Sequence, residues 1–387
     1  MINYRIIALV LSGCLSLTAC GSGGGHQVDK AKLQDKQEDN KNQQEEITEF
    51  TPVTVTSLKE GVDFPIGVAV PAGNYGSSIM LSEDRQNLAI KHFSQLSAEN
   101  IMKMDALHPA QDSFNFTDAD NLVNFASNNG LSMHGHVLVW HSQTASWMRS
   151  FSGDKQAWIE MMENHVTTIA THFAGRLKSW DVVNEAFLDD GNYRSTGESG
   201  SIWYQNIGAE FIERAFIAAR SADPDAELYY NDYNLSSSAA KLDAVVNMAA
   251  DFKSRNIPID GVGFQMHISD NYPSISTIKS QFQKVVDLGI KVKITELDIR
   301  MNSAETADEL TPKIAEKQKK RYYDVVSAYL TTVPASQRGG ITVWGISDID
   351  SWIIGLYDSP DWPLLFNAQF EAKPALQGMA DALAEFK

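Results

Sequence analysis

Two glutamates carry the most informative chemistry in this sequence, because each stands at the end of an apolar stretch typical of a buried strand. Glu185 ends the stretch "SWDVVNEA", and Glu296 lies in "KVKITELDI". A charged side chain in such a setting is costly unless it has partners or takes part in chemistry. Two facing carboxylates suit glycosidic bond cleavage, in which one donates a proton and the other attacks the anomeric carbon or activates water.

The neighbours of Glu296 favour the ionised role for this residue. Asp298 lies two positions further along the strand and therefore on the same face. We expect His267, at the end of "GVGFQMHI", to bridge both carboxylates and to stabilise the charge of Glu296. Glu185 is then the proton donor. Asn184 lies beside it, but strict strand alternation would turn Asn184 away, so spacing alone leaves its role open.

These residues depend on a repeated pattern of strands and helices that runs from about residue 50 to residue 387. Helix candidates include "SEDRQNLAIKHFSQL", "TDADNLVNFASNNG" and "DKQAWIEMMENHVTTIATHFAG"; the last two begin on N-cap residues, Thr117 and Asp154, and end at Gly130 and Gly175. The strand candidates are "PIGVAV", "NIMKMD", "SMHGHVLVW", "LKSWDVVNEA", "ELYYNDYN", "GVGFQMHI", "KVKITELDI" and "GGITVWGISD".

This alternation predicts an α/β fold, a single (β/α)8 TIM barrel. A doubly wound open sheet is the alternative, but no Gly-rich phosphate-binding sequence follows the first expected strand. Active sites of such barrels lie at the C-terminal ends of the strands. Polar and aromatic residues gather at these ends: Lys103 and Asp105, His134, His136, Trp140 and His141, Asn184 and Glu185, residues 231–234, Gln265 and His267, Glu296 and Asp298, Trp344 and Asp348.

Several of these residues also have structural interpretations. The histidines could bind zinc, but the HExxH spacing is absent and no cysteine assists, so we expect no metal. Lys103 could pair with Asp105 as readily as it could donate to a sugar hydroxyl. Trp344 and Trp352 could be core residues, although their expected places beside and beyond a strand end suit stacking on a sugar ring. Residues 231–234, "NDYN", could be only a turn.

Taken together and in this order, the motifs resemble glycoside hydrolase family 10, the retaining endo-β-1,4-xylanases. The matching stretches run from about Thr51 to Lys387 and include "ENIMKMD", "HGHVLVWHSQ", "WDVVNEAF", "LYYNDYN", "GVGFQMHI", "VKITELDI" and "ITVWGISDIDSW". The resemblance implies that Glu185 is the acid/base, that Glu296 is the nucleophile, and that His267 and Asp298 support it. With His141 and Tyr233 added from the same motifs, the expected substrate contacts are Asn100, Lys103, His136, Trp140, His141, Asn184, Tyr233, Gln265, Trp344 and Trp352.

The resemblance therefore predicts endo-hydrolysis of β-1,4-xylosidic bonds in xylan by double displacement, without a metal or organic cofactor. A β-1,4-glucanase or mixed-specificity glycanase on the same scaffold is an alternative. A surface lipoprotein that binds glycans without cleaving them is another, although the presence of both glutamates argues against it. Three departures from the family pattern leave individual contacts open: Val137, the long stretch "LDDGNYRSTGESGSIWYQNIG", and "GVAVPAGNYGSS".

The first 49 residues differ in composition from the rest. Arg5 precedes the apolar run "IIALVLSGCLSLTA", which has the layout of a secretory signal over residues 1–19. The ending "LTAC" resembles a bacterial lipobox and predicts lipidation of Cys20; an ordinary signal cleaved nearby is the alternative. Residues 20–49 are expected to be a flexible polar tether, and residues 50–387 the catalytic domain. We expect an exported, membrane-anchored lipoprotein on the periplasmic face of an outer membrane or the cell surface.

Charge and cysteine content exclude other classes of protein. The net charge of −17 opposes nucleic-acid binding, which needs a basic surface. Loss of Cys14 with the signal would leave only Cys20, so we expect neither a disulfide framework nor a cysteine nucleophile. Stability must then come from a large core, which a chain of this length can bury as a monomer.

Overall fold

The computed structural model describes residues 47–197 and 200–386. Cys20, the expected signal segment and nearly all of the expected tether lie outside the described residues, so the expectations for them stay predictions. A helix long and apolar enough to span a membrane is not found within the described part of the chain.

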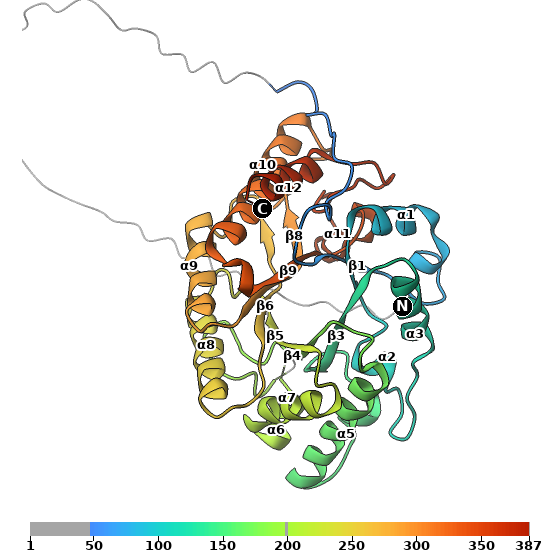
Figure 1. Cartoon of the computed structure of the whole chain (residues 1–387), viewed down its shortest axis with the longest axis vertical. Coiled ribbons are helices and arrows are strands. Elements are labelled where there is room, and N and C mark those ends of the chain that lie inside the picture. Colours follow the sequence, from blue (N-terminus) through green and yellow to red (C-terminus); the bar gives the residue numbers. More distant parts are fainter. Residues whose placement is uncertain (1–46, 198–199, 387) are drawn as a thin grey trace, which may run out of the picture. The chain divides into compact units, whose positions relative to one another are not determined.

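A closed barrel of parallel strands forms the centre of the described fold (Figure 1). Consecutive strands pair from β1 to β6, β6 pairs with β8, β8 pairs with β9, and β9 pairs with β1, which closes the barrel; the short strand β7 (His267–Ser269) pairs with the C-terminal part of β8. The predicted (β/α)8 barrel is therefore confirmed. Its wall consists of β1 (Ile66–Val70), β2 (Gln95–Ala98), β3 (Ser132–Trp140), β4 (Ser179–Asn184), β5 (Glu227–Asp232), β6 (Gly261–Phe264), β8 (Lys291–Arg300) and β9 (Arg338–Val343).

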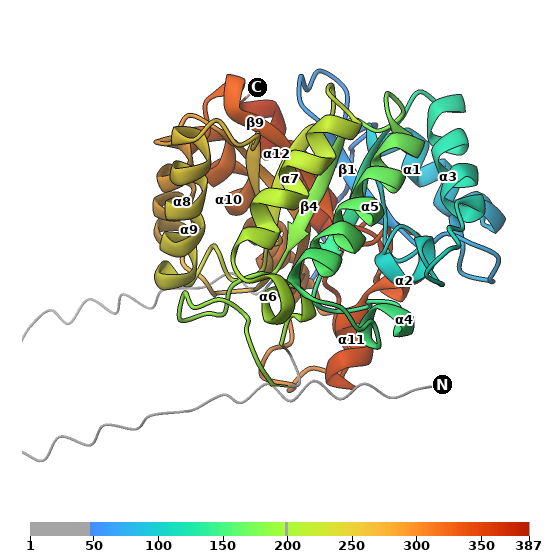
Figure 2. The same cartoon turned by 90° about the horizontal axis from the view of Figure 1, so that it is seen from below.

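Long helices surround the barrel, and short ones follow the C-terminal ends of strands. The long helices are α1 (Glu83–His92), α3 (Thr117–Asn128), α5 (Lys155–Phe173), α7 (Glu210–Ala222), α8 (Ala239–Ser254), α9 (Ile275–Val286), α10 (Pro312–Thr332) and α12 (Pro374–Glu385). Figure 2 shows the short helices on one side of the barrel, its C-terminal end: α2 (Met104–Leu107), α4 (Ser146–Arg149), α6 (Ile202–Ile207) and α11 (Trp352–Tyr357). Three 3-10 turns complete the described elements: η1 (Ile79–Leu81), η2 (Ala335–Gln337) and η3 (Asp348–Asp350).

The second strand differs from the sequence prediction. The stretch "NIMKMD" at residues 100–105 forms a turn and the start of α2, whereas β2 lies earlier, at the end of an expected helix. The reason is that β2 reads "QLSA", and Gln95 accepts a hydrogen bond of 2.7 Å from the buried Lys293 of β8. Polar residues that face other polar groups inside the barrel break the apolar pattern by which a buried strand is recognised.

Helix ends follow the predicted signals with one exception. The Asp154 side chain accepts a hydrogen bond from the Ala157 N–H at 2.9 Å and caps α5. Gly130 and Gly175 follow their helices with φ of 67° and 72°, a conformation that favours glycine. The expected N-cap at Thr117 is wrong, because α3 already includes this residue and the Thr117 N–H donates to the side chain of Asn115.

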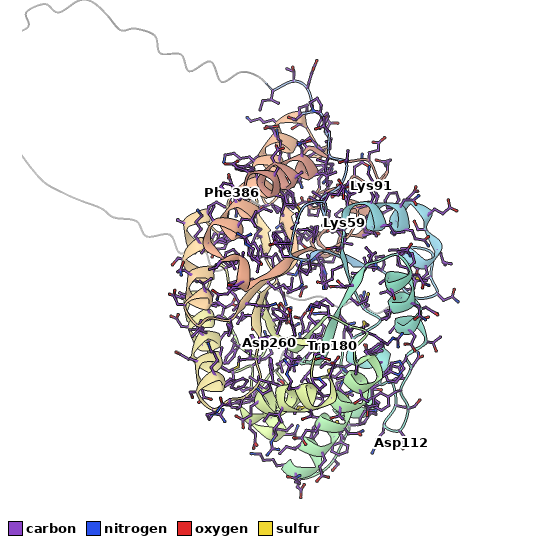
Figure 3. The ribbon with its side chains drawn as sticks, in the orientation of Figure 1. Lys59, Lys91, Asp112, Trp180, Asp260 and Phe386 are labelled. Carbon is purple, nitrogen blue, oxygen red and sulfur yellow. The ribbon has the colours of Figure 1, made fainter. Side chains whose placement is uncertain are left out.

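The barrel wall separates an apolar outer layer from a polar interior. Trp180 of β4, labelled in Figure 3, packs against Phe173 of α5 with ring centroids 6.0 Å apart. The next residue, Asp181, faces inward and lies 3.1 Å from His134 Nε2 and 2.9 Å from His136 Nδ1. Burial alone would raise the pKa of Asp181, but the two histidines hold it well below its usual range. Asp181 and His134 thus belong to the interior of the barrel.

Candidate active site

Glu185 stands where β4 departs from regular strand geometry. Glu185 has a φ of 57°, in a left-handed region that non-glycine residues rarely adopt, and β4 shifts register against β5 between Asp181 and Val183. These departures bring two consecutive side chains to the same side. The Asn184 Nδ2 atom donates to Glu185 Oε1 at 3.2 Å, which answers the question that strand alternation left open.

A chain of amide side chains connects the two glutamates. Gln265 Nε2 donates to Glu185 Oε1 at 2.9 Å and also to Asn184 Oδ1 at 3.2 Å. Asn231 Nδ2 donates to the same Asn184 oxygen at 3.1 Å and to Glu296 Oε1 at 2.8 Å. The site therefore contains both predicted carboxylates, held in one hydrogen-bonded array from β4, β5, β6 and β8.

Two glycines of β6 make room for this array. A Cβ atom on Gly263 would lie 2.5 Å from Asn231 Oδ1 and 2.8 Å from a methyl group of Thr295, and one on Gly261 would meet the ring of Tyr229 at 2.5 Å. Asn231 can therefore reach Glu296 only because "GVG" has no side chains on the inner face. The sequence places Asn231 at a strand end, but its hydrogen bond to Glu296 was not predicted. The alternating glycines of the next strand indicate the space that this contact needs.

His267 bridges Glu296 and Asp298, as predicted. Its Nδ1 lies 2.9 Å from Asp298 Oδ2, and its Nε2 lies 3.2 Å from Glu296 Oε2. Burial by itself would lower the pKa of His267, but Asp298 and then Glu296 raise it to about 10. The Trp352 indole N–H donates to the same Asp298 oxygen at 2.8 Å. The cationic neighbour of Glu296 is therefore His267, and Asp298 fixes the orientation of the His267 ring.

Polar groups also surround Glu185. His141 Nδ1 lies 3.8 Å from Glu185 Oε2, and the Arg194 Nε–H donates to the backbone carbonyl of Glu185 at 3.0 Å. Burial would raise the pKa of Glu185, but His141, Gln265 and Trp140 together bring it below the usual value. Burial lowers the pKa of His141 to about 4, against the opposing effect of Glu185.

Lys103, Asn100 and the tryptophans form another side of the site. Lys103 Nζ donates to Asn100 Oδ1 at 3.0 Å and lies 5.1 Å from the Trp140 ring, while burial lowers the pKa of Lys103 against the opposing effect of Glu296. Trp344 packs edge-on to His136 at 5.4 Å. The direct hydrogen bond of Lys103 goes to Asn100, while Asp105, exposed in α2, acts on Lys103 through its charge.

Two other predicted strand-end residues have partners of their own. Asp348 forms a buried ion pair with Lys373 at 2.8 Å and is a structural residue. The Tyr233 hydroxyl accepts a hydrogen bond from Arg194 at 2.9 Å, and Lys241 Nζ lies 3.3 Å from the centre of the Tyr233 ring. Tyr233 thus lies with Arg194 next to the backbone of Glu185. Direct sugar contacts by Tyr233 and the other expected residues remain predictions.

One group of side chains has the composition of a metal site. His136, Asp181 and Glu296 offer ligand atoms within 4.8 Å of one another. However, His136 Nδ1 and Asp181 Oδ2 are already hydrogen-bonded at 2.9 Å, and Glu296 is held by Asn231 and His267. A cation here would have to displace these bonds, so the donor set does not fit a metal.

Two carboxylates at the C-terminal end of a parallel barrel, one beside an imidazolium and the other beside amide donors, define the site of a glycoside hydrolase. Residues 56–382 match the sequence profile of Glycosyl hydrolase family 10, and the chain belongs to this family.

Relatives with known names cover most of the described fold. The chain is 47% identical over 343 residues to endo-beta-1,4-xylanase Xyn10C of Cellvibrio japonicus, covering 83% of this chain and 56% of that protein. It is 36% identical over 333 residues to endo-1,4-beta-xylanase B of Thermotoga neapolitana, covering 86% of this chain and 92% of that protein. A structure of a mutant xylanase 10C from Cellvibrio japonicus in complex with xylopentaose matches with a TM-score of 0.83 at 44% identity, covering 86% of this chain and 70% of that one. The chain thus spans little more than half of the first relative's length.

Proposed function

We propose that this protein is an endo-β-1,4-xylanase that cleaves xylan with retention of configuration. The observation that carries the proposal is the unequal environment of the two glutamates, with His267 beside Glu296 and Gln265 beside Glu185. The names of the relatives in Cellvibrio and Thermotoga support xylan as the substrate.

In the proposed mechanism, Glu296 attacks the anomeric carbon while Glu185 gives its proton to the departing glycosidic oxygen. The product of this step is a covalent xylosyl ester on Glu296 and a shortened chain. Glu185 then takes a proton from water, and the resulting attack releases the second product and restores both carboxyl groups. A bound sugar chain excludes water from Glu185 and so strengthens the effect of burial, which raises its pKa toward the value a proton donor needs.

The contacts of the other side chains suggest their roles. His267, held by Asp298, stabilises the charge of Glu296 before attack and fixes its orientation. Asn231 donates a hydrogen bond to the amide oxygen of Asn184. The Asn184 side chain therefore lies between the two carboxylates, where we propose that the reacting sugar ring binds. Asn100, Lys103, His136, Trp140, His141, Tyr233, Gln265, Trp344 and Trp352 are proposed as substrate contacts.

A β-1,4-glucanase on the same scaffold is the second candidate. It is favoured by one relative of a different name, exoglucanase XynX of Acetivibrio thermocellus, which is 34% identical over 330 residues and covers 82% of this chain and 28% of that protein. The two candidates share the mechanism and differ in whether the site admits the hydroxymethyl group of glucose.

Product release from xylan, carboxymethylcellulose and mixed-linkage glucan tests the proposal. The parent protein is compared with Glu296→Gln and Glu185→Gln, and with Glu60→Gln as a control at an exposed glutamate. We expect xylo-oligosaccharides from the parent and the control, and none from Glu296→Gln. Preferred release from a glucan would favour the second candidate. Binding of all three glycans without cleavage would instead make the protein a glycan-binding lipoprotein.

We also propose that residues 1–19 are a lipoprotein signal, that Cys20 carries the lipid, and that residues 20–49 tether a monomeric catalytic domain of residues 50–387. The protein would then be exported and anchored in an outer membrane or at the cell surface. The basis is the apolar run ending in "LTAC" and the polar composition that follows. Metabolic labelling with a fatty acid should mark the parent and not Cys20→Ala; equal labelling of both would refute the proposal.

A further inference from the structure

A second buried network lies on the side of β5 that faces α8. Tyr230 donates to Asp232 Oδ2 at 2.6 Å, and Lys241 of α8 lies 2.7 Å from the other oxygen of Asp232. All three side chains are fully buried. The alternation of β5 separates this network from the sugar-binding side, because Asn231, the residue between Tyr230 and Asp232, points the opposite way to Glu296.

This network contacts the main chain around Glu185. The Ala186 N–H donates to the Tyr230 hydroxyl at 2.9 Å, and the Glu185 N–H donates to the Asn231 carbonyl at 3.0 Å. A continuous series of contacts therefore connects α8 to the peptide bond just after Glu185. Lys241 of α8 contacts Asp232, Asp232 contacts Tyr230, and Tyr230 contacts the Ala186 N–H. That peptide follows a residue with a φ of 57°, a conformation that persists only where surrounding contacts hold it.

We propose that Tyr230 and Asp232 are positioning residues for the proton donor Glu185. The Tyr230 hydroxyl accepts a hydrogen bond from the Ala186 N–H, and Asp232 fixes the direction of that hydroxyl by accepting its hydrogen bond. Together they keep Glu185 in the backbone conformation that aims its carboxyl group into the site. The inference rests on the proposed role of Glu185 as acid/base and adds residues that touch neither the substrate nor the reacting atoms.

Asp232 also acts on Glu185 through its charge. Burial raises the pKa of Asp232 to about 7, Lys241 opposes this effect, and the charge of Glu185 adds to it. Because such coupling is mutual, the carboxylate of Asp232 makes ionisation of Glu185 less favourable. Asp232→Asn removes that charge, while Lys241 keeps its positive charge and its contact with Asp189 at 3.3 Å. Loss of the Asp232 charge favours the ionised form of Glu185, so the alkaline limb of the pH profile should move to lower pH.

Substrates with different leaving groups distinguish a positioning role for Glu185 from a general loss of activity caused by a disturbed structure. Cleavage of a natural glycan needs a proton on the departing sugar oxygen, whereas dinitrophenolate departs without one. The experiment compares kcat/KM for the natural glycan that the parent cleaves with kcat/KM for the matching 2,4-dinitrophenyl glycoside. The variants are Tyr230→Phe and Asp232→Asn. The matched control is Tyr229→Phe, which removes a buried hydroxyl from the same strand, one that donates instead to Glu227.

We expect Tyr230→Phe to lose about 10- to 100-fold in kcat/KM on the natural glycan and less than about 3-fold on the dinitrophenyl glycoside, because a small displacement of a catalytic group has a large effect on rate. Tyr229→Phe should leave the ratio of the two substrates unchanged. Equal losses of Tyr230→Phe on both substrates, or no loss on either, would overturn the positioning role. An unshifted alkaline limb in Asp232→Asn would overturn the electrostatic part.

The same experiment keeps this inference distinct from the proposed function. If the parent cleaves a glucan and not xylan, the substrate assignment fails, and the leaving-group ratio is measured on that glucan. If Glu185→Gln shows no leaving-group dependence, the acid role of Glu185 fails, and the positioning role fails with it. Thermal unfolding of each variant shows whether it is folded, and Asp232→Asn provides a second test if Tyr230→Phe is not.

Discussion

His267 and Glu296 are joined by a contact of 3.2 Å between Nε2 and Oε2, on a ring whose other nitrogen is held by Asp298 at 2.9 Å. A pKa raised to about 10 means that the ring is an imidazolium at neutral pH. Asp298 holds this ring from its other side, so the charged nitrogen stays directed at Glu296. The contact therefore places a positive charge against one Glu296 oxygen and fixes the orientation of the carboxyl group.

The first prediction is that His267→Gln lowers the plateau of kcat/KM by about 10- to 100-fold, because Glu296 loses a positively charged and oriented partner. The amide can still contact Glu296, but it brings no positive charge to the carboxylate that attacks the sugar. The measurement is the pH profile on xylan oligosaccharides. His172→Gln is the control, because His172 contacts Asp120 at 3.0 Å in a half-buried pair outside the site. A plateau equal to that of the parent and of the control would contradict the role of His267.

A second prediction concerns stability at alkaline pH. His267 binds its proton more tightly in the folded protein, with a pKa of about 10, than in the unfolded chain, where it is 6.5. Its contribution to the free energy of unfolding is therefore complete below pH 6.5 and is lost as the pH rises through about 10. Urea unfolding of the parent and of His267→Gln should differ most near pH 6 and converge near pH 10.5.

The difference between the two proteins is the quantity to measure, because other groups titrate in this range. Burial lowers the pKa of Lys293 to about 8, and this shift has the opposite sign. Lys293 is present in both proteins, so its effect cancels in the difference. A difference that stays constant from pH 6 to pH 10.5 would show that His267 is not charged in the folded protein.

Trp352 is predicted to act through Asp298 as well as through its ring. Trp352→Phe keeps an aromatic ring but removes the N–H that donates to the buried Asp298 at 2.8 Å. A hydrogen bond to a charged group is worth about 1.5–3 kcal/mol, so we expect kcat/KM to fall by roughly 10- to 100-fold.

Trp147→Phe is the matched control for Trp352→Phe. It removes an indole N–H that donates at 2.9 Å to the backbone carbonyl of His108 and not to a carboxylate. This control should keep its kinetic constants. Equal kinetic losses in both variants would mean that the Trp352 N–H has no special connection to the reaction.

The buried pair of Asp348 and Lys373 gives a prediction on stability. Lys373→Met leaves Asp348 without its partner at 2.8 Å and should reduce the free energy of unfolding by about 3–5 kcal/mol. Lys320→Met, at an exposed pair with Asp324 one helical turn away, should cost no more than about 1 kcal/mol. Urea unfolding near pH 7 measures both. Similar losses would indicate that the buried pair is not the reason for the effect.

Most of the candidate site could be predicted because its residues end strands with a clear apolar pattern. Glu185, Glu296, His267 and Asp298 follow from the strand ends and from the spacing of two residues between Glu296 and Asp298. The bridging position of His267 is confirmed by its two contacts. The apolar strands that carry these residues are buried in the barrel wall, and the barrel brings the ends of its strands together at one edge.

Other features could not be predicted because they depend on contacts between distant strands. β2 was misplaced because Gln95 reads as polar, and only the opposite strand shows that it faces Lys293. Asn184 could not be oriented, because its direction depends on a register shift in β4 and on the φ of Glu185. The link from Tyr230 to the Ala186 peptide has no sequence signal, since its two ends are 44 residues apart.

Trapping the covalent intermediate shows directly whether Glu296 is the nucleophile of a retaining mechanism. The parent protein is incubated with a 2,4-dinitrophenyl 2-deoxy-2-fluoro-xylobioside, digested, and its peptides are weighed by mass spectrometry, with Glu296→Gln treated in parallel. We expect one fluoroxylobiosyl group on the peptide that contains Glu296, and none in the variant. A group on Glu185, or turnover of the compound with no adduct and with inverted configuration, would contradict it.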